Sequence, residues 1–118
     1  MPPSIANLLE LSTASSPRNT PVQAYAKLDF GLCAFYVQSL SVTLGRKAGE
    51  NDHVDVHLGD FKGISRQHAR VQYSFARNCF EIVVFGRNGL FVDNEFHGKG
   101  EVISLEDRYS VLRIPELT

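Results

Sequence analysis

From Ala24 onward, apolar and polar residues alternate with a period of two, which is the pattern of strands that bury one face. The apolar runs lie at residues 40–44, 54–58, 69–73, 79–85, 90–92, 102–105 and 109–114. The run at 79–85 is continuous, as expected of a central strand. No window in this region has apolar residues at helical spacing over the length of a helix. The pattern therefore predicts an all-β fold.

Turn-forming residues separate these runs roughly every 8 to 12 residues, which is typical of an antiparallel β-sandwich or barrel. Asn88-Gly89 predicts a tight hairpin, and Asp93-Asn94 predicts a further turn, because these residue types adopt or tolerate positive φ. The sequence ends at Leu117-Thr118, soon after the last run. Since a sandwich needs another strand to cover that edge, we expect its last C-terminal strand to be missing.

Residues 1–21 differ from the rest, because proline, serine and threonine dominate them. We expect a flexible leader over residues 1–21 and a single domain over 22–118. Within the leader, Ser16-Pro17 and Thr20-Pro21 resemble proline-directed phosphorylation sites, although an unmodified tether is the simpler interpretation.

The composition changes this picture in one respect. A chain of 118 residues can bury a core without disulfide or metal support. Its net charge of −1 gives no global field that would favour nucleic acid or an anionic membrane, so any recognition of an anion has to be local. No apolar stretch approaches the ~20 residues of a membrane span.

Cysteines and histidines do not indicate a metal site. Cys33 and Cys79 lie in apolar stretches, and we expect both to be buried free thiols. The remaining candidates, His53, His57 and His97, lack the spacing of zinc ligands relative to each other or to the cysteines. We expect neither a metal ion nor another cofactor.

Three groups of polar residues stand where apolar runs stop, and should therefore lie on loops: Gly45-Arg46, Ser65-Arg66-Gln67-His68 and Arg87-Asn88-Gly89. A guanidinium, a hydroxyl and a carboxamide held at strand ends can bind a phosphate together with a peptide main chain. This chemistry favours a reader of phosphorylation over an enzyme.

A hydrolase is the catalytic alternative for the same residues. Ser65 and His68 could act as nucleophile and base, with Asp55 or Asp60 orienting the imidazole. Nothing in the sequence resembles a nucleophile elbow, however, and a spacing of three at a strand entrance directs the two side chains to different faces. We therefore expect no enzymatic activity.

With the three groups extended to residues 64–69 and 87–93, the sequence resembles the forkhead-associated (FHA) domain family over residues 24–114. A closer likeness, to the FHA domains of fungal fork-head-like transcription factors including the type that regulates ribosomal-protein genes, rests on residues 24–28, 35–38, 54–56 and 86–89. The resemblance implies an FHA-type antiparallel β-sandwich that binds phosphothreonine peptides.

The resemblance also implies roles for individual residues. Arg46 contacts the phosphate, Ser65 donates its hydroxyl to it, and Arg66 faces the phosphate or the peptide. Asn88 hydrogen-bonds the peptide main chain, and Arg87 contacts the phosphothreonine. The supporting residues are Gly45, Gly89 and His68, of which His68 braces the loop that carries Gly45-Arg46. A surface ion pair of Arg46 with Asp52 or Asp60 is the alternative for that arginine.

The sequence departs from the family pattern at particular loop positions. Leu90 stands where many members have threonine, and Asn94 stands where glycine is common. Gly63 occupies a position where some members carry a side chain that selects a ligand residue, so the ligand motif stays open.

The biological expectation follows from the closer likeness. The domain should be nuclear and monomeric, should belong to a fork-head-like transcription regulator, and should recruit a threonine-phosphorylated protein such as a transcription coregulator. We expect no membrane binding and no direct nucleic-acid binding, because Lys and Arg total 12 against 13 acidic residues. The alternative is a β-sandwich assembly module that binds its partner without phosphate.

Overall fold

The computed structural model describes residues 9–11, 22–31, 33–47, 49 and 53–115. All regular elements in this part are strands. They are β1 (Leu9–Leu11), β2 (Val22–Ala24), β3 (Ala26–Asp29), β4 (Ala34–Val37), β5 (Ser41–Gly45), β6 (Val56–His57), β7 (Ala69–Ser74), β8 (Cys79–Val84), β9 (Leu90–Val92), β10 (Glu95–His97), β11 (Val102–Leu105) and β12 (Tyr109–Arg113). The described residues include no helix that is long and apolar enough to cross a membrane.

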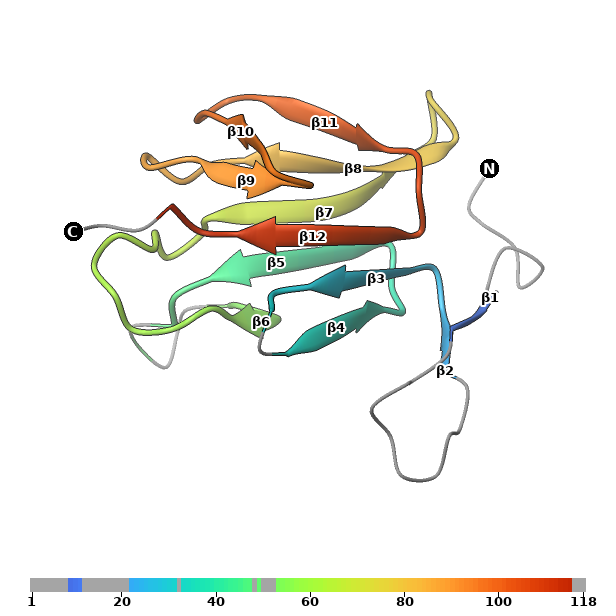
Figure 1. Cartoon of the computed structure of the whole chain (residues 1–118), viewed down its shortest axis with the longest axis horizontal. Coiled ribbons are helices and arrows are strands. Elements are labelled where there is room, and N and C mark those ends of the chain that lie inside the picture. The colour runs from blue at the N-terminus through green and yellow to red at the C-terminus, as the bar shows by residue number, and fades with distance from the viewer. Residues whose placement is uncertain (1–8, 12–21, 32, 48, 50–52, 116–118) are drawn as a thin grey trace.

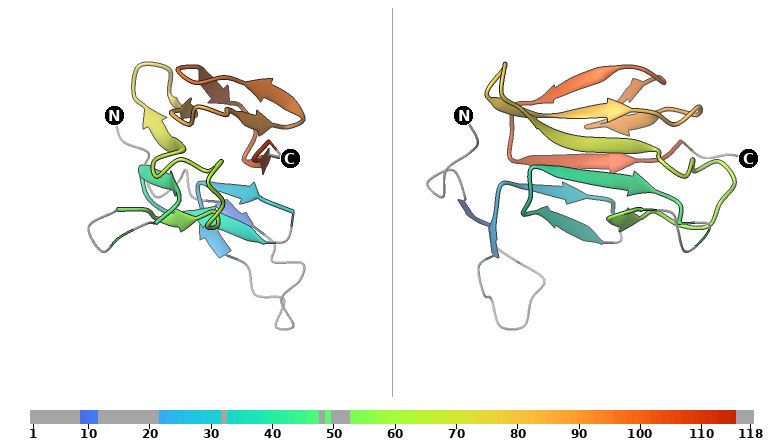
Figure 2. Two further views of the ribbon diagram at one scale, coloured as in Figure 1. Left: turned by 90° about the vertical axis from the view of Figure 1, so that its left-hand side faces the viewer. Right: turned by 180° about the vertical axis from the view of Figure 1, so that it is seen from behind.

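Two five-stranded sheets form the body of the domain (Figures 1 and 2), in the orders β10-β9-β12-β3-β4 and β11-β8-β7-β5-β6. Their inner faces contribute to one buried cluster. Leu28 and Leu112 enter it from the first sheet, and Leu44 and Ile82 from the second, all at most 1% exposed. Burying each such side chain stabilises the fold by about 1.5–3 kcal/mol. The predicted β-sandwich is confirmed.

Both sheets are mixed, whereas the sequence predicts antiparallel strand pairs only. β12 runs parallel to β3, and β5 runs parallel to β6, whereas the other pairs of the two sheets are antiparallel. Whether a further strand follows β12 stays a prediction, since residues 116–118 lie outside the described part.

The predicted leader lies mostly outside the described residues, at 1–8 and 12–21. Its described part, β1, pairs with β2, which begins directly after residue 21, as a separate two-stranded antiparallel sheet. The division into a leader and a domain at residue 22 stays a prediction.

The predicted runs coincide with strands where one face is buried. β7 follows the alternating burial expected from residues 69–73, and β9 and β11 match their runs residue for residue. The run at 54–58 shortens to β6. Neither β4 nor β10 is expected from the apolar runs, because each lies at a sheet edge and has only one or no buried side chain.

The two predicted turns have different outcomes. Asp93 and Asn94, with φ of 50° and 69°, connect β9 and β10 as a two-residue hairpin of the type that requires positive φ twice. Asn88-Gly89 also lies in a turn, in which the Gly89 N–H donates to the Gly86 carbonyl at 3.0 Å. The predicted hairpin is wrong there, since β8 and β9 belong to different sheets. The turn therefore carries the chain across the sandwich.

The cysteines are both free, but the prediction of burial is wrong for Cys33, which is exposed. Cys33 lies in the connection between β3 and β4, where its carbonyl accepts a hydrogen bond from the Phe30 N–H at 2.9 Å. A tight turn at the end of a sandwich leaves such a side chain in solvent. Cys79 is half-buried at the start of β8.

The strand directions decide which loops meet. β5 and β8 end, and β7 and β9 begin, at the end of the sandwich that lies on the left of Figure 1. The β7–β8 hairpin and the turn between β11 and β12 lie at the opposite end. The connections that carry the three polar groups therefore share one end of the molecule.

Candidate functional site

Every site residue predicted from the sequence lies on one of these three neighbouring connections. Gly45 ends β5 and Arg46 directly follows it. The connection from β6 to β7 carries Ser65, Arg66 and His68, and the connection from β8 to β9 carries Arg87, Asn88 and Gly89. The structure brings them together at one end of the sandwich (Figure 1).

Gly45 allows two of the loops to touch. It is buried, and a Cβ atom on it would lie 2.0 Å from the carbonyl oxygen of Arg66. That close approach lets the Arg46 N–H donate to the Ser65 carbonyl at 3.1 Å. A side chain at position 45 would force the loops apart, and with them the guanidinium and the hydroxyl.

The guanidinium of Arg46 is held by one of its nitrogens. Its Nε donates to the carbonyl of Ile64 at 2.9 Å, which fixes the direction of the planar group. The two Nη atoms remain for a ligand, and paired donors of this kind match a phosphate or a carboxylate.

Asn88 is anchored to the same loop. Its Nδ2 donates to the carbonyl of Gly63 at 2.9 Å, next to the anchor of Arg46 on Ile64. The side-chain oxygen and the second amide hydrogen remain to accept from and donate to a peptide main chain. Both anchors use backbone carbonyls, so the two side chains are positioned by one short segment, residues 63–64.

The other predicted ligand residues surround this pair. Ser65 is half-buried and directly follows the segment that holds Arg46 and Asn88, whereas Arg66 and Arg87 are exposed. The three arginines therefore come from three different connections. Such an arrangement can offer positive charge to a bound anion from several sides.

His68 is completely buried and joins two of the connections. Its Nδ1 accepts a hydrogen bond from the Ser65 N–H at 3.1 Å, and its Nε2 lies 2.7 Å from the Gly89 carbonyl. The two bonds are compatible only in the tautomer with the proton on Nε2, which donates to the carbonyl. The imidazole thus acts as a bridge between the Ser65 loop and the Asn88-Gly89 turn.

Gly86 is a site residue that the sequence analysis does not assign. A Cβ atom there would lie 2.4 Å from the His68 ring, so only glycine leaves room for the imidazole. The signal in the sequence is its place two residues before Asn88, at the end of a continuous apolar run.

The hydrogen bonds of His68 also argue against a Ser–His hydrolase. Nδ1 is occupied by a backbone N–H and Nε2 by a carbonyl, so neither nitrogen can accept the proton of the Ser65 hydroxyl. The proposed orienting carboxylates lie elsewhere: Asp55 accepts from the Thr43 N–H, and Asp60 pairs with His57 at 3.3 Å.

Carboxylates do not neutralise the arginines of the site. Asp60 pairs with His57 and not with Arg46, and none of the described carboxylates lies in ion-pair distance of Arg46, Arg66 or Arg87. Asp52, the other alternative partner of Arg46, lies outside the described residues. Glu101 is bound by the Gly98 N–H, which together with His97 lowers the pKa of its carboxyl group.

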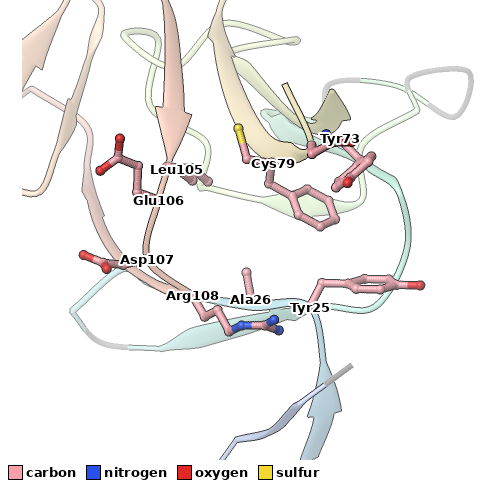
Figure 3. A pocket seen from close by; sticks show the side chains of 10 residues that line it. Tyr25, Ala26, Tyr73, Cys79, Leu105, Glu106, Asp107 and Arg108 are labelled. Carbon is pink, nitrogen blue, oxygen red and sulfur yellow. The ribbon is translucent and has the colours of Figure 1, made fainter. Parts of the chain in front are cut away.

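A hollow of about 200 Å³ lies at the opposite end of the sandwich (Figure 3). Tyr25, Tyr73 and Phe80 line it together with Glu106 and Arg108. None of the predicted site residues lines this hollow. Over the described residues, no group of three or more His, Cys, Asp or Glu side chains is placed to hold a metal ion.

Comparisons with known proteins match this arrangement of motifs. The sequence profile described as "FHA domain" matches residues 42–111. The chain is 51% identical over 89 residues to the fork-head transcriptional regulator FHL1 of Candida albicans, and 43% identical over 99 residues to the pre-rRNA-processing protein FHL1 of Saccharomyces cerevisiae. These matches cover 73% and 80% of this chain, but only 8% and 10% of those two proteins.

Two further matches come from more distant proteins. The FHA domain-containing protein FHA1 of Arabidopsis thaliana is 36% identical over 107 residues, which is 88% of this chain and 42% of that protein. A solved structure titled "Rv0020c_FHA Structure" is 21% identical with a TM-score of 0.49, covering 70% of this chain and 73% of that one.

We predict that His68→Ala lowers the free energy of unfolding by about 2–5 kcal/mol, because it leaves a cavity and two unpaired backbone groups at Ser65 and Gly89. Chemical denaturation of wild type and variant measures this. The matched control is His53→Ala, whose side chain is 82% exposed and which should change stability by less than about 0.5 kcal/mol. Equal stability of His68→Ala and wild type would contradict the bridging role of the imidazole. Ester hydrolysis by wild type that is lost in His68→Ala would support the alternative of a Ser–His hydrolase.

Proposed function

The chain belongs to the FHA domain family, and on that basis we propose that it binds phosphothreonine peptides through the end of the sandwich that carries Arg46, Ser65 and Asn88. FHA domains are phosphopeptide-binding modules that use arginine clusters. The observation that carries the proposal is the anchoring of Arg46 and Asn88 to adjacent carbonyls, which leaves their remaining polar atoms for a ligand.

The roles follow from the chemistry of the groups. The Nη atoms of Arg46 and the hydroxyl of Ser65 bind the phosphate oxygens, and Arg66 adds positive charge from the same loop. The carboxamide of Asn88 binds the peptide main chain on either side of the phosphothreonine, and Arg87 contacts that residue. Gly45, His68 and Gly89 hold the loops in place, as does Gly86.

The expected affinity is moderate. A phosphate carries about −1.5 to −2 charges and three acceptor oxygens at neutral pH. Each charge-assisted hydrogen bond contributes roughly 1.5–3 kcal/mol before the costs of association. When the costs of association are subtracted from the free energy of a few such bonds, the remainder corresponds to a dissociation constant on the order of micromolar.

The biological role that we propose comes from the relatives. Two proteins similar to this chain are named as a fork-head transcriptional regulator and a pre-rRNA-processing protein. We infer that this domain belongs to a nuclear transcription regulator of the fork-head-like type, and that as a monomer it recruits a threonine-phosphorylated coregulator. Contact with DNA then falls to another part of such a regulator.

We predict that Arg46→Ala weakens binding of a phosphothreonine peptide selected from an oriented library by at least about tenfold, because it removes charge-assisted bonds worth roughly 1.5–3 kcal/mol. Titration calorimetry measures the affinity. Arg77→Ala is the control, since it removes the same charge at the opposite end of the sandwich, where Arg77 donates to Ser104. Affinity within threefold, or about 0.7 kcal/mol, of wild type for Arg46→Ala would refute the assignment of the phosphate site.

We predict a preference for phosphothreonine over phosphoserine of about fourfold or more. Burying the γ-methyl group near Arg87 and Asn88 contributes about 0.8 kcal/mol, and the methyl group also restricts the rotamer that presents the phosphate. Matched peptides that differ only in this methyl group measure the effect. Equal affinities would rule out a threonine-specific pocket, while leaving phosphate binding in place.

We predict that wild-type domain captures a transcription coregulator from nuclear extract, that Arg46→Ala does not, and that phosphatase treatment of the extract abolishes capture. Removing the phosphate removes most of the charge-assisted bonds of the ligand at once. Capture that survives both treatments would instead support the alternative, a phosphate-independent assembly module. A partner from a cytoplasmic signalling pathway would contradict the transcriptional role alone.

A further inference from the structure

An aromatic strip leads from the candidate site onto the outer face of the first sheet. It consists of Phe96 on β10, Phe91 on β9 and Arg113 on β12, and we call it the Phe96 strip. Phe96 pairs with Phe91 and Phe91 with Arg113 across the three strands, so the side chains stand in one row. The two phenyl rings meet edge to face with centroids 5.3 Å apart, and the Arg113 guanidinium carbon lies 4.0 Å from the centroid of the Phe91 ring.

The strip begins where the candidate site ends. A Cβ atom on Gly89 would lie 2.5 Å from Cζ of Phe96, so the Phe96 ring packs directly on the residue that follows Asn88. Gly89 has a φ of +77°, so its conformation and its lack of a side chain are both needed at this contact. A peptide that lies across Asn88 can therefore continue over Phe96 without crossing a gap.

The strip differs from the rest of the same face, where the polar groups satisfy one another. Lys27 Nζ lies 5.7 Å and 5.6 Å from the ring centroids of Tyr36 and Tyr109. The Tyr109 hydroxyl donates to the Asp29 carboxylate at 2.5 Å, a bond that lowers the pKa of Asp29. The charged and hydroxyl groups on that half of the face are therefore already engaged with each other and less available to a partner.

The Phe96 strip leaves its groups available. Phe96 is 52% exposed, although phenylalanine is among the residue types that are most often buried. Arg113 is stacked on Phe91 but has no carboxylate in ion-pair distance among the described residues. Stacking holds the planar guanidinium while its edge stays open, and that edge matches a carboxylate in bidentate fashion.

We propose, on the basis of the proposed function, that the Phe96 strip is a second subsite that binds one flank of the phosphothreonine peptide. The flank carries an apolar side chain, which packs on Phe96, and an Asp or Glu, which pairs with Arg113. Aromatic and arginine side chains are enriched among the residues that dominate protein interfaces, and this strip presents both in one row. A basic flank is repelled by Arg113, so the subsite selects among phosphorylated partners by charge.

The experiment uses pools of peptides with a fixed phosphothreonine and mixed residues beside it. The outer flank, placed on either the N-terminal or the C-terminal side, alternates Glu and Leu in the first pool, Gln and Ser in the second, and Lys and Leu in the third. Wild-type domain should bind the Glu-Leu pool about fivefold or more tighter than the Gln-Ser pool for one of the two placements. Fluorescence anisotropy at fixed salt measures the affinities.

Variants of the strip test the assignment. Arg113→Gln and Phe96→Ala should lose the preference for the Glu-Leu flank while binding the Gln-Ser pool like wild type. Arg113→Glu should turn the preference toward the Lys-Leu flank, a gain that a destabilised protein would not produce. The controls are Arg77→Gln and Phe75→Ala at the opposite end of the sandwich. Phe75 is 48% exposed and meets Tyr73 edge to face at 5.1 Å, much as Phe96 meets Phe91.

The outcomes separate this proposal from the function on which it rests. The subsite is overturned if the wild-type domain shows no flank preference, or if Arg113→Gln and Phe96→Ala both retain that preference. Either result counts even if phosphorylated pools still bind better than unphosphorylated ones. Equal binding of phosphorylated and unphosphorylated pools overturns the proposed function. An Arg113-dependent preference that persists in that case supports the strip as a peptide-binding surface in its own right.

Discussion

The buried imidazole of His68 is the contact on which the geometry of the site depends. It accepts from the Ser65 N–H and donates to the Gly89 carbonyl, so it connects the loop between β6 and β7 of the second sheet with the turn that leads from β8 to β9 of the first sheet. Buried polar bonds of this kind are expensive to leave unmade, which gives the loops a fixed separation. Gly86 leaves space for the ring, and Gly45 brings the third loop against the same segment. The positions of the candidate site loops therefore depend on the buried contacts beneath them.

The local pairing of carboxylates bears on how a chain with a net charge of −1 would bind an anion at one end. Glu101 is bound by a neighbouring backbone N–H, and Asp29 by the Tyr109 hydroxyl. These carboxylates are satisfied locally and do not approach Arg46 or Arg113. Arg46 and Arg113 thus have no described carboxylate in ion-pair distance, a local feature of which overall composition gives no sign.

The positions of most strands and of the three polar loops could be predicted from the sequence, because both follow from which side chains alternate and where the alternation stops. The destination of β9 could not, since Asn88-Gly89 specifies a local turn and says nothing about which sheet receives the next strand. The exposure of Cys33 could not be predicted for a similar reason, because its apolar neighbours in the sequence do not show that the residue lies in a turn. Gly86 contacts His68, and Phe96 of β10 contacts Gly89, and no local sequence pattern encodes either contact.

The anchoring of Arg46 and Asn88 to the carbonyls of Ile64 and Gly63 bears on how the site would discriminate. A long side chain that is already fixed loses less rotamer freedom when it binds, so more of each new bond contributes to affinity. The fixed side chains also cannot move to bind a ligand whose phosphate lies at a different distance from the peptide main chain. Arg66 and Arg87 have no such anchor and are exposed, so they can adjust to different peptides. The anchored groups would then set the position of the phosphate, the exposed arginines would add to its binding, and the Phe96 strip would set how tightly the sequence around it is held.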